Sequence, residues 1–163
     1  MTGFWRCGIY FAITGTFAFF AGRIVPKHWF CFDRFPYKCM AFEQSGKIYD
    51  RIRIRKWLNK VPDMSRIFKC MPAKKITGKL TPENLHIMIR ETCVAECVHG
   101  ILNITGLGCF LLWDSGWCII LYGAYVLLGN LPFMLIQRHT RPRLVRILHR
   151  YETKGKEAIK CVC

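Results

Sequence analysis

Two apolar runs separated by three residues decide the fold of this chain. Residues 93–113 read CVAECVHGILNITGLGCFLLW, and residues 117–136 read WCIILYGAYVLLGNLPFMLI. About 20 helical residues cross the ~30 Å hydrocarbon core of a bilayer, so each run is predicted to be a transmembrane helix. Because only Asp114-Ser115-Gly116 separates the runs, we expect the two helices to form an antiparallel hairpin.

A third apolar run lies near the N-terminus. Residues 7–22 are flanked by Arg6 on one side and Arg23 on the other. The end of this run lacks the pair of small residues that a signal-peptide cleavage site needs, so we expect an uncleaved anchor. The sequence therefore predicts one all-α integral membrane domain over residues 1–163, with three transmembrane helices at about 7–22, 93–113 and 117–136.

Positive charge is distributed unevenly around these spans. Of the residues that produce the net charge of +15, sixteen Lys and Arg lie in residues 23–92 and eight in the tail 137–163. Arg6 alone precedes the first span, and the turn at Asp114 has none. Since cytoplasmic loops carry the excess of Lys and Arg, we expect a multi-pass cell-membrane protein with its N-terminus outside and its C-terminus in the cytoplasm. Apolar runs of bilayer length argue against nucleic acid as the partner of this charge.

The segment 23–92 is predicted to be cytoplasmic and partly interfacial. The aromatic residues from Trp29 to Tyr37 lie among Lys27, Arg34 and Lys38, as in a stretch that lies among lipid headgroups. Residues 46–61 are basic on every side of a helical wheel, which fits an interfacial helix or a solvated face attracted to anionic lipid. Thr81-Pro82-Glu83 is a typical helix start, so a helix should run from Pro82 into the second span.

Ten cysteines raise the question of a zinc site or disulfides. None of them has the paired C-x-x-C spacing of a structural zinc site. Several lie within the apolar runs, where a free thiol behaves as a small hydrophobic group. We therefore expect reduced, unpaired thiols and no metal site.

Three ionisable residues fall at the start of the second span. Glu91 lies just before it, and Glu96 and His99 lie one to two turns inside. On a helix, the His99 imidazole projects between the two carboxylates and is within reach of Glu96. A charge at the centre of a span costs about 2.5–3.5 kcal/mol on insertion scales, so these residues are functional candidates. The alternatives are an ion pair between Glu96 and a basic residue of the segment 23–92, and a packing role for His99.

Polar residues also interrupt the end of the third span. Asn130 precedes Pro132, which has no N–H to donate and is expected to bend the helix. The span then ends in three arginines at the membrane boundary: Arg138, Arg141 and Arg143. Guanidinium groups suit phosphate or carboxylate, although an ordinary basic flank has the same composition. Pro142 biases Arg141 toward an extended backbone, so the helix is expected to end there.

Four stretches in register resemble a known family. They occur in order over roughly residues 23–150 and comprise Phe42-Glu43 with Gly46 and Tyr49; Arg55-Lys56-Trp57 to Pro62-Asp63; Glu91-Thr92 with Ala95-Glu96 and His99; and Asn130, Pro132, Gln137-Arg138, Arg141 and Arg143-Leu144. These stretches are similar to the glycosyl-4,4′-diaponeurosporenoate acyltransferases, small membrane proteins that move a fatty acyl group onto a sugar hydroxyl of a lipid-linked glycoside. The chain departs from the family pattern at Leu58, Gly100 and His139-Thr140, which leaves the acceptor open.

The resemblance implies a catalytic site on the cytoplasmic side. His99 would be the general base, because imidazole titrates near working pH, and Glu91 or Glu96 would fix its tautomer. Substrate binding is implied for seven side chains: Arg138, Arg141, Arg143, Asn130, Gln137, Arg55 and Trp57. The arginines would bind the phosphates of an acyl-CoA or acyl-carrier-protein donor, with no bound cofactor. The acceptor would be a glycosylated carotenoid or another glycolipid in the membrane.

Two other functions fit parts of the sequence. Small membrane methyltransferases that use S-adenosylmethionine also place polar residues on kinked C-terminal helices, but the sequence has no nucleotide-binding Gly-rich turn. A non-enzymatic adaptor that binds anionic lipid would explain the basic segment. It would not explain Glu96 and His99 inside a span. The oligomeric state is left open.

The charge distribution predicts where a reporter enzyme becomes active. An enzyme that works only outside the cell should be inactive when fused after Lys75 and active when inserted at Asp114, because the first site belongs to the basic segment. Activity of the Lys75 fusion would reverse the predicted orientation.

Overall fold

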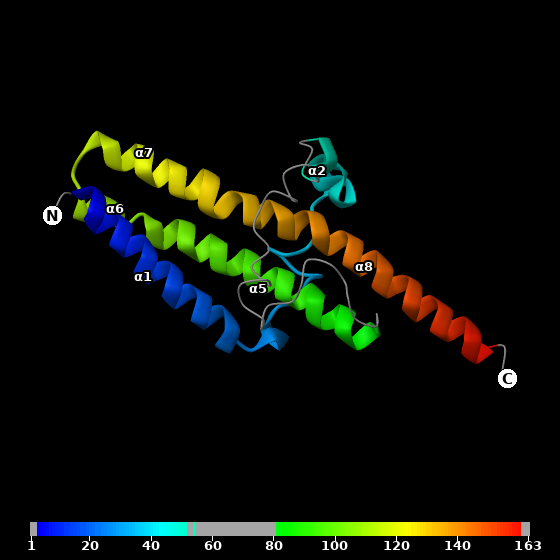
Figure 1. Cartoon of the computed structure of the whole chain (residues 1–163). Coiled ribbons are helices and arrows are strands. Elements are labelled where there is room, and N and C mark those ends of the chain that lie inside the picture. The colour runs from blue at the N-terminus through cyan, green and yellow to red at the C-terminus, as the bar shows by residue number, and fades with distance from the viewer. Residues whose placement is uncertain (1–2, 52–53, 55–80, 161–163) are drawn as a thin grey trace.

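The computed structural model describes residues 3–51, 54 and 81–160, with the backbone alone for 44–47, 50 and 154–160. All regular structure in these residues is helical (Figure 1). Of the predicted interfacial stretch 46–61, the described part begins with α2 (Lys47–Arg51). Most of that stretch lies outside the described residues, so its conformation stays a prediction.

Three helical segments are long and apolar enough to cross a membrane. They are α1 (Gly3–Ile24); α5 (Pro82–Gly106) followed by the short α6 (Cys109–Leu112); and a continuous rod of α7 (Gly116–Ala124), the π-helix η3 (Tyr125–Asn130) and α8 (Leu131–Lys160). Their length and composition indicate a multi-pass membrane protein, as the sequence predicts.

α5 begins where Thr81-Pro82-Glu83 predicted a helix start. Thr81 is its N-cap, and the Thr81 hydroxyl accepts a hydrogen bond from the backbone N–H of Asn84 at 3.3 Å. Pro82 takes the first helical position, where its missing N–H leaves no helical bond unmade. Glu83 lies in the first turn, where the helix dipole favours an acid. The prediction of one helix from Pro82 into the second span is confirmed.

The second span is divided near its far end. α5 ends at Gly106, and the chain turns at Leu107 and Gly108 before α6 begins. A Cβ atom at Gly108 would overlap the Tyr10 hydroxyl of α1. That hydroxyl donates to the backbone carbonyl of Thr105 at 2.6 Å. The glycine therefore allows α1 to approach the end of α5, a close contact that apolar composition does not specify.

The third span is irregular beside Pro132, where the sequence predicted a bend and the structure has a π-helix. Pro132 has no N–H, so the carbonyl of Leu128 lacks its usual helical donor. The chain forms the π-helix η3 just before this proline. Such π turns inside α-helices are frequent at functional sites. The expectation that Pro142 ends the helix is wrong, because α8 continues through it to Lys160.

Packing explains why α8 continues past Pro142. Leu144 and Leu148 follow this proline and are buried against Leu85 and Ile89 of α5. Burying a side chain of this size stabilises by about 1.5–3 kcal/mol, and a proline inside a helix costs about 3 kcal/mol. Two such contacts therefore outweigh the local preference of the proline.

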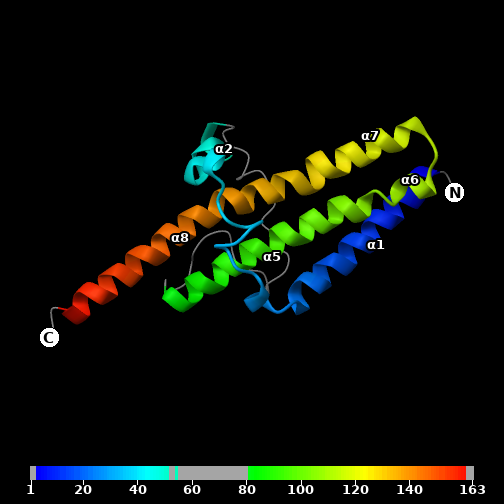
Figure 2. The ribbon, with the colours of Figure 1, turned by 180° about the vertical axis from the view of Figure 1, so that it is seen from behind.

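The three spans lie side by side, with α5 between α1 and the α7–α8 rod in both views (Figures 1 and 2). α5 packs along both α1 and α8. The N-terminus, α6 and the start of α7 gather at one end of the bundle, and α5 begins toward the other end (Figure 1). The segment after α1 packs against α5 through η1 (Lys27–Trp29) and against α8 through η2 (Ala41–Gly46).

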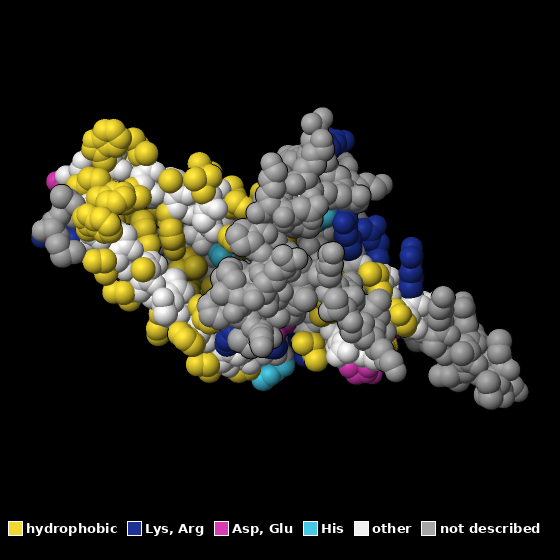
Figure 3. Space-filling view, viewed as in Figure 1, with side chains coloured by type: hydrophobic (Ala, Val, Ile, Leu, Met, Phe, Trp, Pro, Cys, Tyr) yellow, Lys and Arg dark blue, Asp and Glu magenta, His cyan; other side chains and the backbone are white. Residues whose placement is uncertain are grey.

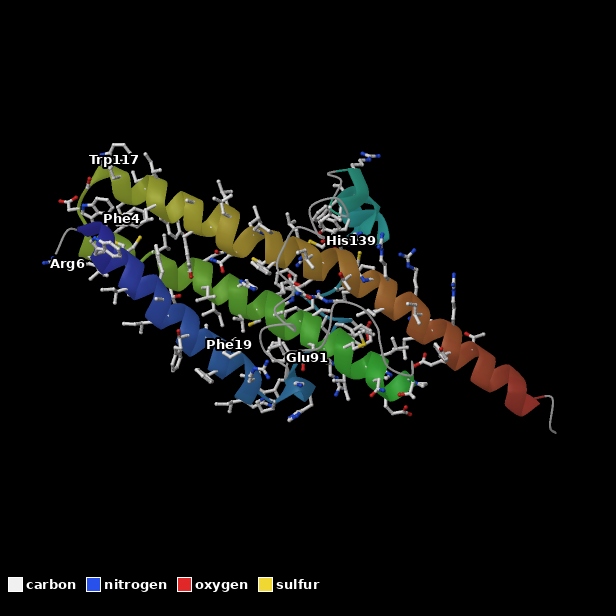
Figure 4. The ribbon with its side chains drawn as sticks, in the orientation of Figure 1. Phe4, Arg6, Phe19, Glu91, Trp117 and His139 are labelled. Atoms are coloured by element: carbon white, nitrogen blue, oxygen red, sulfur yellow. The ribbon has the colours of Figure 1, made fainter. Side chains whose placement is uncertain are left out.

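Apolar and basic side chains gather on different parts of the face seen in Figure 3. In Figure 3, hydrophobic side chains cover the half that holds α1 and α7, and Lys and Arg gather mainly on the other. Large apolar side chains such as Phe17 and Leu111 are 75% and 91% exposed. Trp117 and Phe4 lie at the end where α7 begins (Figure 4). This surface suits lipid, since an exposed apolar area of this extent is rare in soluble monomers.

The close approach of helices at Gly106 predicts a packing-sensitive position. A Cβ atom there would lie 2.9 Å from Tyr125 Cε1 and 3.2 Å from Tyr122 Cε2. The Tyr125 ring has little room to move, because it stacks on Phe11 with 4.1 Å between ring centroids. Gly106→Ala should therefore lower the unfolding free energy by about 1–3 kcal/mol, measured by thermal denaturation in detergent.

Gly123→Ala is the matched control for this prediction. Gly123 lies inside α7, and nothing lies within 4 Å of a Cβ atom built on it. Its replacement should leave the thermal midpoint unchanged or raise it, because alanine favours the helix. Equal midpoints for the two variants would mean that the Gly106 contact is not close.

Candidate active site

A buried carboxylate on α5 is bound by two arginines of α8. Glu96 is 5% exposed, and its Oε1 accepts a hydrogen bond from Arg138 Nε at 2.7 Å. Its Oε2 accepts one from Arg141 Nη2. The two arginines are three residues apart, so α8 presents both to the same neighbour. The structure thus shows Glu96 in an ion pair, but its partners belong to α8 and not to the segment 23–92 as that alternative expected.

Arg138 joins this pair to the segment that follows α1. Its Nη1 donates to Glu43 Oε1 at 2.8 Å, and its Nη2 donates to the carbonyl of Pro36 at 2.7 Å. Glu43 is 2% exposed and also accepts bonds from the Met40 N–H at 2.7 Å and from the Tyr49 hydroxyl. One guanidinium therefore connects a transmembrane carboxylate with a carboxylate of η2.

Proton affinities outside the spans agree with this network. Burial acts to raise the pKa of Glu43, but hydrogen bonds from Tyr49, Arg138 and Met40 outweigh it and leave the pKa below its usual value. Burial, followed by the bond to Glu43, raises the pKa of Tyr49, so the phenol stays a donor. The stability from Glu43 is thus present above its unfolded-state pKa and is lost as pH falls through the lowered folded-state pKa.

Arg141 is the most buried guanidinium in this network. It is 4% exposed. Besides Glu96, it donates to Thr92 Oγ1 at 2.9 Å, to the Thr92 carbonyl at 3.1 Å and to the Tyr37 carbonyl at 2.7 Å. A planar fork of donors can meet all these acceptors at once, whereas an ammonium group cannot.

A cavity of about 240 Å³ opens beside the two arginines. Its lining combines acidic, basic and apolar side chains from the segment after α1 and from α8: Asp33, Tyr37, Lys38, Glu43, Arg138 and Arg146 among them. The cavity therefore adjoins the ion-pair network.

His99 lies one turn further along α5 than Glu96. Its Nδ1 is 2.9 Å from Asn130 Oδ1, and its ring stacks on Phe133 with 5.0 Å between centroids and 7° between planes. Asn130 is 2% exposed and lies at the last position of the π-helix. The π turn and the proline after it therefore position the partner of the imidazole.

The Asn130 amide settles which imidazole nitrogen carries the proton. Asn130 Nδ2 donates to the carbonyl of Tyr125 at 3.3 Å, so Oδ1 is the atom that faces His99. An amide oxygen only accepts hydrogen bonds, and Nδ1 of His99 must therefore be the donor. In the neutral ring this leaves Nε2 with its lone pair.

The carboxylates predicted to orient His99 have other partners. We expected the imidazole between Glu91 and Glu96, but Glu91 pairs with Lys27 of η1, and Glu96 is held by the two arginines. Glu91 lies toward η1, where the chain leaves α1 (Figure 4). A buried carboxylate needs a cation more than it needs a neutral imidazole, which explains why Glu96 pairs with α8.

The remaining predicted residues fall in different places. Gln137 and Arg143 both belong to α8, on either side of the arginines of the network. Arg55 and Trp57 lie outside the described residues, so their predicted role in substrate binding stays a prediction.

Four network residues were not predicted as site residues: Glu43, Tyr49, Thr92 and Tyr37. Glu43, Tyr49 and Thr92 lie in the stretches that carry the family resemblance. That resemblance is the feature of the sequence from which they could have been predicted. Glu43 is 95 residues from Arg138 in the sequence. Local pattern has no means of pairing residues so far apart.

The Arg141 contacts predict that lysine is a poor replacement. Arg141→Lys keeps the charge but leaves several acceptors unpaired, and bonds to charged groups contribute about 1.5–3 kcal/mol each. Its thermal midpoint in detergent should fall clearly. Arg146→Lys is the control, because Arg146 is exposed and its one described hydrogen bond is to the Pro142 carbonyl at 3.3 Å. A stable Arg141→Lys protein would contradict this geometry.

Comparisons with known proteins identify the family of this chain. The sequence model of the family described as glycosyl-4,4′-diaponeurosporenoate acyltransferase matches residues 26–150, which include all the network residues. Proteins of that name from Staphylococcus aureus strains Newman and bovine RF122 / ET3-1 are 25% and 24% identical over 153 residues, which cover 92% of this chain and 90% of each relative. No solved structure matches the chain. The chain therefore belongs to the glycosyl-4,4′-diaponeurosporenoate acyltransferase family.

Proposed function

We propose that this protein transfers a fatty acyl group onto a hydroxyl of a lipid-linked sugar, with His99 as the general base. The observation that carries the proposal is the hydrogen bond between His99 Nδ1 and Asn130 Oδ1 inside a membrane-spanning helix pair. It leaves Nε2 free to accept a proton, and no described residue is bonded to that nitrogen. Alcohols are weak nucleophiles, so acyl transfer to a hydroxyl needs such a base.

The reaction requires one proton to move from the acceptor hydroxyl to His99 and then from His99 to the leaving group. The acceptor oxygen attacks the carbonyl carbon of an acyl thioester while His99 Nε2 takes the hydroxyl proton. A C–O bond forms, the C–S bond breaks, and the imidazolium returns the proton to the departing thiolate. Asn130 holds Nδ1–H throughout, so the ring keeps its orientation in both protonation states.

The arginines have a different part in this proposal from the one expected at first. Arg138 and Arg141 already bond to Glu43 and Glu96, so their main role is to hold α5, α8 and the η2 segment together. The cavity beside them, with Lys38 and Arg146 in its lining, is the proposed place for the anionic part of an acyl-CoA or acyl-carrier-protein donor. The acyl chain would then lie along the apolar surface of the spans.

The proposed orientation places this site at the cytoplasmic face. It rests on the Lys and Arg distribution and on the gathering of the N-terminus and the α6–α7 turn at one end of the bundle. In this orientation the second and third spans form a hairpin, and the segment 23–92 lies at the inner membrane surface. The acceptor is a glycolipid, by analogy with the family name.

His99→Ala should abolish the activity without loss of folded protein. General-base catalysis contributes about 10²–10⁴-fold in rate, so membranes with the variant should transfer acyl groups from palmitoyl-CoA to dodecyl glucoside at a background rate. Lipidomics of cells with the wild-type gene should detect an acylated glycolipid that cells with His99→Ala lack.

His149→Ala is the control for the loss of an imidazole. His149 is on α8, its side chain is 69% exposed, and its contact is with Glu152. This variant should retain wild-type activity. Full activity of His99→Ala would place the base elsewhere, and an unchanged lipid profile in wild-type cells would overturn the proposed reaction.

A further inference from the structure

One polar side chain next to the proposed base is not explained by the mechanism above. Asn103 lies four residues after His99 on α5, so the two project from the same face one helical turn apart. Both face the same strip of α8: His99 contacts Phe133, and Asn103 Nδ2 is 3.5 Å from Met134 Sδ. The backbone carbonyl of Asn103 accepts a bond from the Tyr122 hydroxyl at 2.9 Å.

The side-chain oxygen of Asn103 is buried and has no hydrogen-bond partner within the described part of the chain. The Asn103 amide points its NH₂ group at the thioether sulfur of Met134. This orientation is the favourable one, because the sulfur is a weak acceptor and therefore attracts the NH₂ group rather than the oxygen. An unsatisfied buried polar group costs about 1–3 kcal/mol. Such a group in a folded protein therefore indicates that a hydrogen-bond donor from another molecule binds there.

We propose that Asn103 Oδ1 accepts a hydrogen bond from a second hydroxyl of the acceptor sugar, next to the hydroxyl that His99 deprotonates. This inference rests on the proposed function. His99 Nε2 and Asn103 Oδ1 are both acceptors on one helix face, and their backbones are four residues, or about 6 Å, apart along the axis. Two acceptors at this spacing fit a polyol, which offers several O–H donors, better than a simple alcohol.

Met134 makes this binding mode accessible. Its unbranched side chain has three rotatable bonds, so it can move aside at low cost and expose the amide oxygen. Its contact with Asn103 is a weak N–H···S interaction, so little binding energy is lost when Met134 moves. Asn103 then orients the sugar so that one hydroxyl points at His99. It is a specificity residue and takes part in no proton transfer.

The experiment compares dodecyl glucoside with each of its monodeoxy analogues, in membranes supplied with palmitoyl-CoA. The analogue without the reacting hydroxyl is inert for every variant. The wild-type protein should lose about 10- to 100-fold in kcat/KM on one further analogue. Asn103→Leu should show that loss on the parent glucoside and no additional loss on that same analogue, because the two changes remove one interaction.

Thr105→Val is the matched control. Thr105 is polar and lies two residues later on α5. Among the described residues, its Oγ1 bonds only to carbonyls of its own helix, Ile101 at 3.0 Å and Leu102 at 3.4 Å. It should keep the wild-type response to every analogue.

The outcomes separate this inference from the proposed function. Wild-type activity of Asn103→Leu, with His99→Ala inactive, overturns the role of Asn103 alone. The role of Asn103 is also overturned if Asn103→Leu lowers kcat/KM by the same factor on every analogue, in addition to the loss that each analogue shows with the wild-type protein. A purely structural role would have that result. If Asn103→Leu does not fold, the wild-type series decides: equal rates on all analogues with the reacting hydroxyl overturn the inference. An active His99→Ala protein instead refutes the proposed base.

Discussion

The rest of the structure depends on the neutralisation of one carboxylate, Glu96, inside a membrane-spanning helix. An unpaired charge at this depth would cost several kcal/mol, and the bilayer offers no water to satisfy it. Arg138 and Arg141 provide that partner from α8, which fixes how α8 lies against α5. Their positions three residues apart set the rotation of α8, because both guanidiniums must face the same helix. Removing both guanidiniums would leave Glu96 as an uncompensated buried charge.

The same arginine extends this constraint to the segment after α1. The Arg138 guanidinium has further N–H donors besides the one that binds Glu96, and these donate to Glu43 and to the Pro36 carbonyl. The segment is therefore held by charge-assisted bonds as well as by apolar packing, such as that of Phe30 on Cys93 and Val94. On the other side of α8, His139 lies toward α2, and the Tyr49 ring meets it edge to face at 6.3 Å (Figure 4). The cavity lies between this segment and α8, since residues of both line it.

The site separates charge from the proposed base. The ion pairs occupy one turn of α5, and His99 and Asn103 occupy the next turns, where Asn130 provides a neutral amide. A neutral partner fixes the tautomer without adding another charge to the span. This arrangement needs the π turn before Pro132, since that turn brings Asn130 to the face that His99 reaches. Pro132 and Asn130 thus act together to orient His99.

The sequence by itself determined the elements that depend on local chemistry. Apolar runs of bilayer length predicted the three spans, and Thr81-Pro82 predicted the start of α5. The partners of the polar side chains were decided only by tertiary structure. Glu96 went to the arginines and His99 to Asn130, and α8 continued through Pro142 because Leu144 and Leu148 pack on α5. A helical wheel ranks neighbours on one helix, whereas a buried charge selects the strongest partner in three dimensions, however far away it lies in the sequence.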